Sequence, residues 1–535
     1  MINFLEIVML DSIFEKAEIA GSILEEYSQE EIDRVVEQIA KDGEANALRL
    51  GELAHNETGY GKPEDKKIKN ILATKLLWDS IKNEKTVGII KEDPVNKIIE
   101  VAAPVGIVAA VIPSTNPTST TLYKAIISLK GRNPIIFSPH PAAKGCIKET
   151  VDLIRNSLKK VGAPEDAVQI LENPTIELTK QMMSHPKTGV ILATGGLGLV
   201  KAAYSSGKPA YGVGPGNVPV FIERTADVEK AVKDVIAGKT FDNGTVCASE
   251  QAIIADKPVA KQVVEELLKN NAYILKGDEM DKVAKVVVTE KFSANPKIVG
   301  KPATYIAQLA GVNVPDKTVA LVAPLDGVGK EYPLSVEKLS PVLALYIEDG
   351  WEAACKRCIQ LLKFGGLGHS LGIHTRNKEV LKQFALKKPA SRIIVNSPTT
   401  HGAVGYSTNL MPSMTLGCGT LGNNITSENI TAKHMINVKR VAFETNPVNK
   451  GRFSPSDFYF KDVKASTIES IIESKLGEID KPVEKDYKDE VYDFVCEEDV
   501  KKAVRENRKI LINDKTMITP LALDEGRKHN IFKKV

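Results

Sequence analysis

Short apolar runs alternate with helical patterns along most of this chain, and this alternation limits the fold more than any other feature of the sequence. Gly106–Ile112 is a continuous apolar run, as expected for a parallel strand that is buried on both faces. Further strand patterns follow at 134–137, 169–171 and 189–193, separated by helical segments. Strands that alternate with helices form βαβ units, so the sequence predicts an α/β fold with a doubly wound parallel sheet.

A second alternation of the same kind begins at Ala252 and includes strand patterns at 318–323, 342–347 and 393–396. The chain has 535 residues, whereas a single hydrophobic core rarely grows beyond about 250–300 residues. We therefore expect two Rossmann-type domains, with a ligand site in the cleft between them.

The predicted boundaries follow from these patterns and from changes in composition. We assign 14–240 to the first domain, 241–409 to the second, 410–453 to a segment that returns to the first domain or to an oligomer contact, and 454–535 to a C-terminal extension. A strand pair at about 86–102 stands apart from the main sheet. It is either an oligomerisation hairpin or an ordinary edge hairpin.

The C-terminal extension differs in composition from the rest of the chain. Ile468, Ile471, Ile472 and Leu476 fall on one face of a predicted helix at 466–476, next to a spacer rich in proline and charged residues. Such a helix can recognise a groove on another protein, and packing on its own subunit is an equal alternative. No internal repeat is evident.

Composition argues against several classes of function. The formal net charge is +3 and aromatic residues make up 5% of the chain, so neither a nucleic acid nor an anionic membrane surface is indicated as a partner. No apolar run reaches the roughly 18 residues of a membrane span, and Met1–Leu10 carries Glu6 without a basic leader. We expect a cytoplasmic protein with reduced cysteines. The histidines have no partner pattern and the CxxC of Cys355 and Cys358 has no second pair, so we predict no metal site.

One thiol stands in a setting that indicates chemistry. Cys247 lies in the small-residue segment Phe241–Gln251, between a helical pattern at 228–238 and a strand pattern at 252–255. A thiolate is a strong nucleophile, and backbone N–H groups or a helix N-terminus can lower a thiol's pKa. A lone cysteine is more often a packing residue, so the assignment of a nucleophile depends on the motifs around it.

Polar residues and glycines follow the strands of the first alternation where each strand ends. They are Asn116, Ser138, His140, Thr194, Gly195 and Gly196. Ligands of doubly wound sheets bind beyond the carboxyl ends of the strands, so these residues should share one rim. The glycines open a helical pattern, where backbone N–H groups can hold a pyrophosphate.

Several longer motifs occur in order along the chain, at 112–119, 136–141, 193–209, 212–217, 241–251, 364–369 and 415–419. Together they resemble the CoA-acylating aldehyde dehydrogenases, especially the aldehyde dehydrogenase half of bifunctional aldehyde/alcohol dehydrogenases and the acylating succinate-semialdehyde dehydrogenases. The resemblance runs from about Phe14 to Arg440 and does not include the tail. It implies an aldehyde dehydrogenase-like fold, NAD or NADP as hydride acceptor and free coenzyme A as acyl acceptor.

The resemblance also implies roles for individual residues. Cys247 corresponds to the nucleophile, and Asn116 to the amide that, with a backbone N–H at Cys247, holds the oxyanion; otherwise Asn116 is a turn former. His369 corresponds to a histidine near the nucleophile, for which we hypothesise a proton relay to coenzyme A; otherwise it is a satisfied loop histidine. The implied cofactor contacts are Ser138 and His140 beside the adenosine, Gly195 and Gly196 at the pyrophosphate, Glu337 at the nicotinamide-side ribose, and Thr194 and Gly214 in the same loops. The alternative for Glu337 is a surface charge.

One absence predicts the fate of the acyl group. In hydrolytic relatives a Glu activates water at a position that matches Val213 or its neighbours, and Tyr211–Gly216 contains no acid. Without a general base, water attacks a thioester slowly, whereas a thiol supplies some thiolate and is far more nucleophilic. We therefore predict acyl-CoA, rather than the free acid, as the product.

The predicted activity is the reversible, CoA-dependent oxidation of acetaldehyde or propionaldehyde to acyl-CoA with NAD(P)⁺. The alternatives are an acidic aldehyde such as succinate semialdehyde, held by the polar loop Ser397–His401, a non-acylating aldehyde dehydrogenase, and a scaffold protein that docks through its tail. We expect a homo-oligomer in the cytoplasm or inside a bacterial microcompartment. Shell proteins and a partner alcohol dehydrogenase are the further partners that this setting implies.

Overall fold

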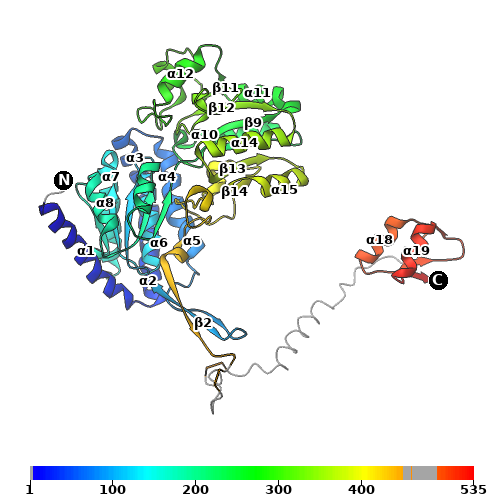
Figure 1. Cartoon of the computed structure of the whole chain (residues 1–535), viewed down its shortest axis with the longest axis horizontal. Coiled ribbons are helices and arrows are strands. Elements are labelled where there is room, and N and C mark those ends of the chain that lie inside the picture. Colours follow the sequence, from blue (N-terminus) through cyan, green and yellow to red (C-terminus); the bar gives the residue numbers. More distant parts are fainter. Residues whose placement is uncertain (1–3, 447, 450–458, 461–490) are drawn as a thin grey trace. The chain divides into compact units, whose positions relative to one another are not determined.

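Two parallel sheets organise the larger part of the chain (Figure 1). The computed structural model describes residues 4–446, 448–449, 459–460 and 491–535. Contacts divide the chain into two units, Met1–Thr445 and Asn446–Val535, and both sheets belong to the first unit. The predicted helix at 466–476 lies outside the described residues, so its docking role stays a prediction. Among the described helices, none combines the length and apolar character that crossing a bilayer requires.

The first sheet is parallel and has β3 at its centre. Its strands lie in the order β5 (Val168–Ile170), β4 (Ile135–Pro139), β3 (Ile107–Ile112), β6 (Thr188–Thr194) and β7 (Ala210–Val213). Ala109 of β3 lies opposite Ile136 on β4 and Ile191 on β6. Every residue of β3 is buried, because both faces of the sheet are covered by helices, and its apolar run therefore has no polar side.

Two groups of helices cover this sheet. The helices on one face are α2 (Gln29–Ala45), α3 (Ala47–Thr58), α6 (Pro117–Lys130) and α7 (Lys144–Lys160). The helices on the other face are α1 (Phe4–Glu25), α8 (Ile176–Ser184) and α9 (Leu197–Tyr204). Between α3 and α6 the chain forms α4 (Pro63–Ile71), one π-helical turn at Leu72–Leu76 and α5 (Leu77–Ile81). The predicted doubly wound α/β fold is confirmed.

The second sheet is also parallel. Its strands lie in the order β10 (Ala272–Ile274), β11 (Ala320–Pro324), β12 (Val342–Glu348), β9 (Glu250–Asp256), β8 (Val218–Ile222), β13 (Gly368–His374) and β14 (Ala390–Val395). The helices that pack on it are α10 (Val228–Thr240) and α11 (Ala260–Lys269) on one face, α14 (Trp351–Gly365) and α15 (Lys378–Lys387) on the other, and α12 (Glu279–Val287) and α13 (Ala303–Leu309) beside β11 and β12. Cys355 and Cys358 are buried on α14 in this core.

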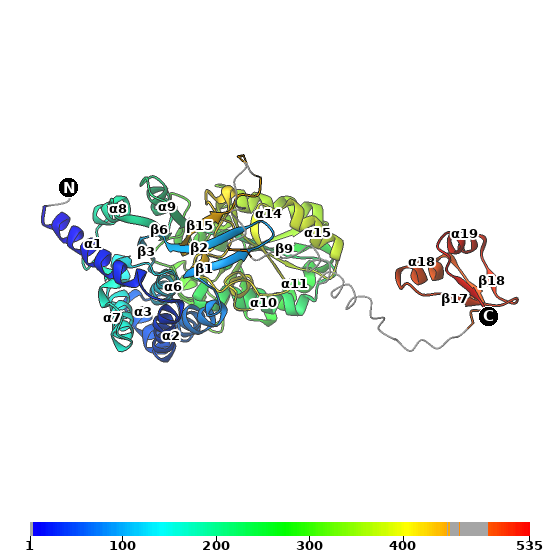
Figure 2. The ribbon, with the colours of Figure 1, turned by 90° about the horizontal axis from the view of Figure 1, so that it is seen from below.

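A third sheet extends from the body of the first unit (Figures 1 and 2). The strands β1 (Gly88–Asp93) and β2 (Ile98–Pro104) form the predicted hairpin. The return segment adds β15 (Ile436–Ala442), which pairs antiparallel with β2. The hairpin is therefore not a free two-stranded ribbon, and its role in oligomer contact stays a prediction.

The described part of the second unit contains a repeat that the sequence reading missed. Each half has a short strand, a nine-residue helix, an asparagine with positive φ and a second strand. The first half is β16 (Phe494–Val495), α18 (Glu497–Arg505), Asn507 and β17 (Ile510–Ile512), and the second half is β18 (Met517–Ile518), α19 (Pro520–Lys528), Asn530 and β19 (Phe532–Lys534). Strand β16 pairs with β18, and β17 pairs with β19. Few residue types recur at matching positions of the two halves, so the repeat is not visible in the amino-acid sequence.

The buried Tyr123 links the return segment to the first sheet's helices by a hydrogen bond, and removal of its hydroxyl tests how much that bond contributes to stability. The hydroxyl of Tyr123 on α6 donates to the Ile430 carbonyl at 2.6 Å. Tyr123→Phe leaves that buried carbonyl without its donor, so we expect the unfolding free energy of the first unit to fall by about 1–3 kcal/mol. Urea unfolding followed by circular dichroism measures the change. Tyr305→Phe is the control, because Tyr305 is 40% exposed; an equal loss in both variants contradicts the assignment.

Candidate active site

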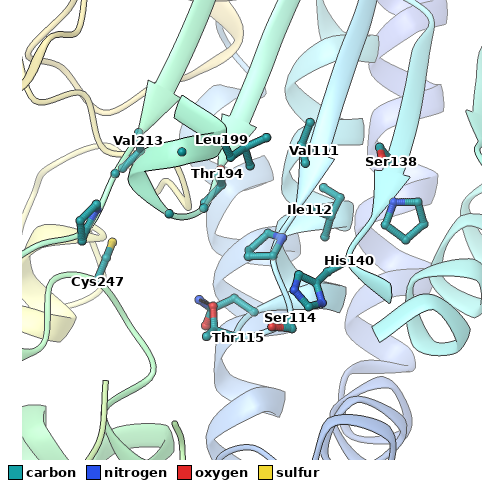
Figure 3. Close-up of a pocket in the computed structure, with 18 of the residues that line it drawn as sticks. Val111, Ile112, Ser114, Thr115, Ser138, His140, Thr194, Leu199, Val213 and Cys247 are labelled. Atoms are coloured by element: carbon teal, nitrogen blue, oxygen red, sulfur yellow. Dashed lines mark hydrogen bonds between the residues drawn. The ribbon is translucent and has the colours of Figure 1, made fainter. Parts of the chain in front are cut away.

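A cavity of about 580 Å³ lies at the carboxyl ends of the first sheet's strands. Its walls come from the loops that follow β3, β4, β6 and β7 and from the loop that precedes β9. The predicted site residues that line it are Asn116, Ser138, His140, Thr194, Gly195, Gly196, Gly214, Cys247 and Glu337. Figure 3 shows Cys247 at one end of this cavity and Ser138 and His140 at the other. Of the predicted set, His369 does not line the cavity.

The loop of Cys247 is shaped by a tight turn, η4 (Phe241–Gly244). Asp242, Asn243 and Gly244 have φ values of 47°, 52° and 76°, a left-handed conformation that Asp, Asn and Gly tolerate best. The turn reverses the chain after α10 and brings Cys247 into the cavity just before β9. The residues Asp242, Asn243 and Gly244 therefore suit the positive φ angles of this turn.

The thiol of Cys247 is not activated by its protein surroundings. Burial, the nearby carboxylate of Glu337 and the thiol of Cys418 together raise the pKa of Cys247 to about 12, against the smaller lowering effects of the Arg392 charge and a backbone hydrogen bond. The thiol is therefore protonated at neutral pH. This differs from the sequence argument that backbone N–H groups would lower its pKa, because burial outweighs them.

Asn116 ends the loop after β3, directly before α6. Its Oδ1 accepts a hydrogen bond from Lys69 Nζ at 2.6 Å, and its Nδ2 donates to Thr115 Oγ1 at 3.1 Å. Asn116 does not cap α6 with its side chain, so the amide serves neither a turn nor a helix cap. This amide and the Cys247 thiol line the same cavity.

Glu337 is a half-buried carboxylate that lines the cavity and not a surface charge. Its Oε1 accepts a hydrogen bond from the Gly216 N–H at 2.9 Å. Burial raises the pKa of Glu337 to about 7, although the Gly216 N–H, Lys239 and Lys338 favour the charged form. Of the described residues that line the cavity, Glu337 is the single carboxylate.

The strand ends at the far side of the cavity fit a dinucleotide. Helix α9 begins at Gly196 without a side-chain cap, so its first N–H groups can bind a phosphate. Within the described part of the chain the buried Thr194 hydroxyl has no hydrogen-bond partner, as expected for a group that awaits a ligand. Ser138 Oγ lies 2.7 Å from Thr179 Oγ1, and His140 Nδ1 accepts the Ala142 N–H at 3.1 Å.

His369 lies behind the cavity wall, in strand β13 and not in a loop. It is 1% exposed, and its Nδ1 lies 3.1 Å from Ser370 Oγ. A Cβ added to Gly216 would come within 2.3 Å of the Cys247 carbonyl and 3.1 Å of the His369 ring, so only glycine fits between them. Burial, with help from Arg392, lowers the pKa of His369 to about 3. The imidazole is therefore neutral, and its role in proton relay stays a prediction.

Sequence reasoning missed the charged residues beneath the nucleophile loop. Lys66, Lys69 and Asn70 are buried on α4, and Lys66 and Lys69 both form ion pairs with Asp242. The available signal was the spacing i, i+3, i+4, which places three polar residues on one helix face. Among the described residues no group of three or more His, Cys, Asp or Glu side chains is arranged to hold a metal ion.

Two parallel sheets covered by helices, with a cavity at the carboxyl ends of the first sheet's strands and a thiol at one end of that cavity, define the class of this α/β protein. The chain belongs to the aldehyde dehydrogenase family, whose model matches residues 8–406. It is 45% identical over 421 residues to an aldehyde-alcohol dehydrogenase of Clostridium acetobutylicum, covering 78% of this chain and 48% of that protein. It is 41% identical over 436 residues to an acetylating succinate-semialdehyde dehydrogenase of Clostridium kluyveri, covering 82% and 96%.

A solved structure agrees with these relatives. An acetylating aldehyde dehydrogenase from Geobacillus thermoglucosidasius superposes with a TM-score of 0.82 at 49% identity, covering 84% of this chain and 99% of that one. The resemblance to acylating aldehyde dehydrogenases that the motifs predicted is confirmed. The chain spans about half the length of the aldehyde-alcohol dehydrogenases that it matches.

The raised pKa of Cys247 predicts a slow and steeply pH-dependent reaction with iodoacetamide. With a pKa of about 12, only about 10⁻⁴ of the thiol is ionised at pH 8, and the rate should rise about tenfold per pH unit from pH 7 to 10. Glu337→Gln removes a neighbouring negative charge and should speed alkylation above pH 7, where Glu337 is ionised. Mass spectrometry of the Cys247 peptide measures the rate, with Cys247→Ser as the blank. A rate that levels off below pH 9 contradicts the raised pKa.

Proposed function

We propose that this protein catalyses the reversible, CoA-dependent oxidation of a short aliphatic aldehyde to its acyl-CoA, with NAD(P)⁺ as oxidant. The observation that carries the proposal is one cavity that contains the Cys247 thiol, the Asn116 amide and the dinucleotide-fitting strand ends. Bound NAD(P)⁺ supplies the hydride acceptor. Ser138 and His140 would lie at its adenosine, Thr194, Gly195, Gly196 and Gly214 at its pyrophosphate, and Glu337 at its second ribose.

The chain's own residues form and then release a covalent acyl group. The Cys247 thiol releases its proton to solvent water, and the sulfur adds to the aldehyde carbon as the C=O π bond breaks, which gives the thiohemiacetal oxyanion. The Asn116 Nδ2 donates to the new oxyanion, a contact whose loss typically costs about 2.7–4 kcal/mol of transition-state stabilisation. Oxidation leaves a thioester on Cys247, and the sulfur of coenzyme A then attacks the carbonyl and expels the Cys247 thiolate.

The choice of coenzyme A over water rests on the walls beside the thiol. Val213, Gly214 and Pro215 line the cavity where hydrolytic relatives carry their base. Glu337 is the single carboxylate among the described lining residues, and its Oε1 is engaged by the Gly216 N–H. Because the wall formed by Val213, Gly214 and Pro215 carries no carboxylate to activate water, we expect thiolysis to be the faster route.

A small apolar cavity of about 20 Å³ adjoins the main one and supports a short acyl chain. Val246, Val404 and Met414 line both cavities, and Leu72 and Phe241 close the smaller one. Cys247 packs against this apolar cluster, so the chain of a thioester on its sulfur would extend there. The space suits the methyl or ethyl group of acetaldehyde or propionaldehyde.

Two donors of the loop that would bind an acidic aldehyde already bond a carboxylate of the protein. The Thr399 N–H and the Thr400 hydroxyl bond the buried Glu250 carboxylate at 2.6 Å and 3.1 Å. The His401 ring packs edge-on against Phe241, and burial lowers the pKa of His401. These contacts favour a neutral aldehyde over succinate semialdehyde.

The reaction is tested by following reduced cofactor with several aldehydes and NAD⁺ or NADP⁺, with and without coenzyme A. We expect turnover of acetaldehyde and propionaldehyde that requires coenzyme A, and acyl-CoA as the product. Cys247→Ser should abolish turnover, and Asn116→Ala should lower kcat by about 10²–10³-fold. Equal activity without coenzyme A would show a hydrolytic enzyme instead.

Chain-length preference is tested at Val404, which lines both cavities. Val404→Ala enlarges the small cavity and should raise the ratio of kcat/KM for butyraldehyde over acetaldehyde by about tenfold, since one methylene is worth about 1–3 kcal/mol in such pockets. Val404→Ile is the matched control and should shift the ratio in the opposite direction. If both substitutions leave the ratio unchanged, the acyl chain lies elsewhere.

The setting of the protein follows from the same proposal. A homo-oligomer, a separate alcohol dehydrogenase as partner, and a cytoplasmic or microcompartment location stay predictions.

A further inference from the structure

Two buried lysines meet one buried carboxylate beneath the nucleophile loop. Lys66, Lys69 and Asp242 are 2%, 3% and 0% exposed. Lys66 Nζ lies 3.0 Å from Asp242 Oδ2, and Lys69 forms an ion pair with the same oxygen. Buried lysines are rare because removing the ammonium from water is costly. A second carboxylate, Asp65, lies close by: its Oδ2 accepts the Asp242 N–H at 2.7 Å, and its charge favours the charged form of Lys69. The two lysines therefore differ in their hydrogen-bond partners rather than in the charge that they balance.

The contacts of Lys69 show what the additional ammonium does. Besides Asp242, its Nζ donates to Asn116 Oδ1 at 2.6 Å and approaches Thr245 Oγ1 at 3.3 Å. An ammonium has three hydrogens and no acceptor, so these three contacts use its whole capacity. Lys66 instead directs its second contact to the Thr115 carbonyl at 3.3 Å.

The Lys69 ammonium donates hydrogen bonds and accepts none, and this determines the orientation of the Asn116 amide. Because Lys69 cannot accept a hydrogen bond, the oxygen of Asn116 must face it and the NH₂ group must face away. One hydrogen of that NH₂ bonds Thr115 Oγ1 at 3.1 Å, which leaves the other for the cavity. We infer that Lys69 is a positioning residue that locks the Asn116 amide with its N–H toward the reacting carbonyl, an inference that rests on the proposed function.

Asp242 connects this lock to the nucleophile loop. Its carboxylate accepts the Thr245 hydroxyl at 2.6 Å and the Lys62 N–H at 2.7 Å. Burial alone would raise the pKa of Asp242, but Lys69 and Lys66 hold it below its usual value. Burial lowers the pKa of Lys69 to about 8, with Asp242 opposing the fall. Asp242 therefore holds both the Lys69 ammonium, which contacts the Asn116 amide, and the loop that carries Cys247.

The test compares two near-isosteric substitutions. Lys69→Met removes the contact to Asn116 and leaves the balanced pair of Lys66 and Asp242. Lys66→Met is the matched control, because it removes an equal charge from the same carboxylate and keeps the Asn116 contact. We expect kcat to fall by about 10–100-fold in Lys69→Met, less than the 10²–10³-fold expected on losing the donor itself, with KM for the cofactor unchanged. Lys66→Met should lose less than about threefold, and an equal fall in both variants overturns the inference.

A double-mutant cycle shows whether Lys69 acts through the amide. In the Asn116→Ala background, Lys69→Met should change kcat by less than about threefold. A full 10–100-fold loss there overturns the inference, because Lys69 would then act independently of Asn116. If Lys69→Met does not fold, Lys69→Gln replaces it in the same cycle, since its amide can present either a donor or an acceptor to Asn116.

A structural readout separates this inference from the proposed function. Wild-type protein without CoA-dependent activity refutes the proposed function and leaves the orientation of the amide to be measured directly. In neutron crystal structures, which distinguish the amide oxygen from the NH₂ group, we expect the Asn116 amide to flip or disorder in Lys69→Met and not in wild type. An amide that keeps the same orientation in Lys69→Met overturns the inference whether or not the enzyme is active.

Discussion

The geometry of the site depends on the ion pairs that the buried carboxylate of Asp242 forms with Lys66 and Lys69. This carboxylate lies in a left-handed turn of the nucleophile loop and binds two lysines of α4, while the same lysines contact Thr115 and Asn116 at the end of β3. An unpaired buried charge costs several kcal/mol, so neither the loop nor the helix can move away alone. The thiol and the amide therefore keep their spacing although they belong to loops that are far apart in sequence.

The surroundings of the cavity keep the Cys247 thiol protonated, and therefore poorly nucleophilic, in the free protein. Burial raises the pKa of Cys247 to about 12 and that of Glu337 to about 7, and it lowers that of His369 to about 3. A protonated thiol reacts slowly with electrophiles at neutral pH, and the imidazole of His369 is shielded because it is 1% exposed. The same dry surroundings strengthen the Asn116 hydrogen bond once an oxyanion forms, because a low dielectric strengthens each polar contact.

The sequence was informative where a local pattern has one physical meaning. Apolar runs such as Ile107–Ile112 predicted strands buried on both faces, and the polar residues after them were placed on one rim, which the structure bears out as the lining of one cavity. Strand β13 was missed because its glycines and histidines break the apolar pattern while neighbours on both faces bury it. The repeat in the second unit was missed because backbone order, and not side-chain identity, is what its halves share.

The sequence by itself determined the fold class, the nucleophile candidate and the absence of an acid in Tyr211–Gly216, since each depends on residue type and local order. Only the tertiary structure decided that Glu337 lines the cavity, that His369 lies behind Gly216, and that Lys69 faces the Asn116 amide. These facts depend on contacts between segments that are distant along the chain, and burial there sets the pKa values and the direction of each hydrogen bond. Local patterns carry no information on such contacts.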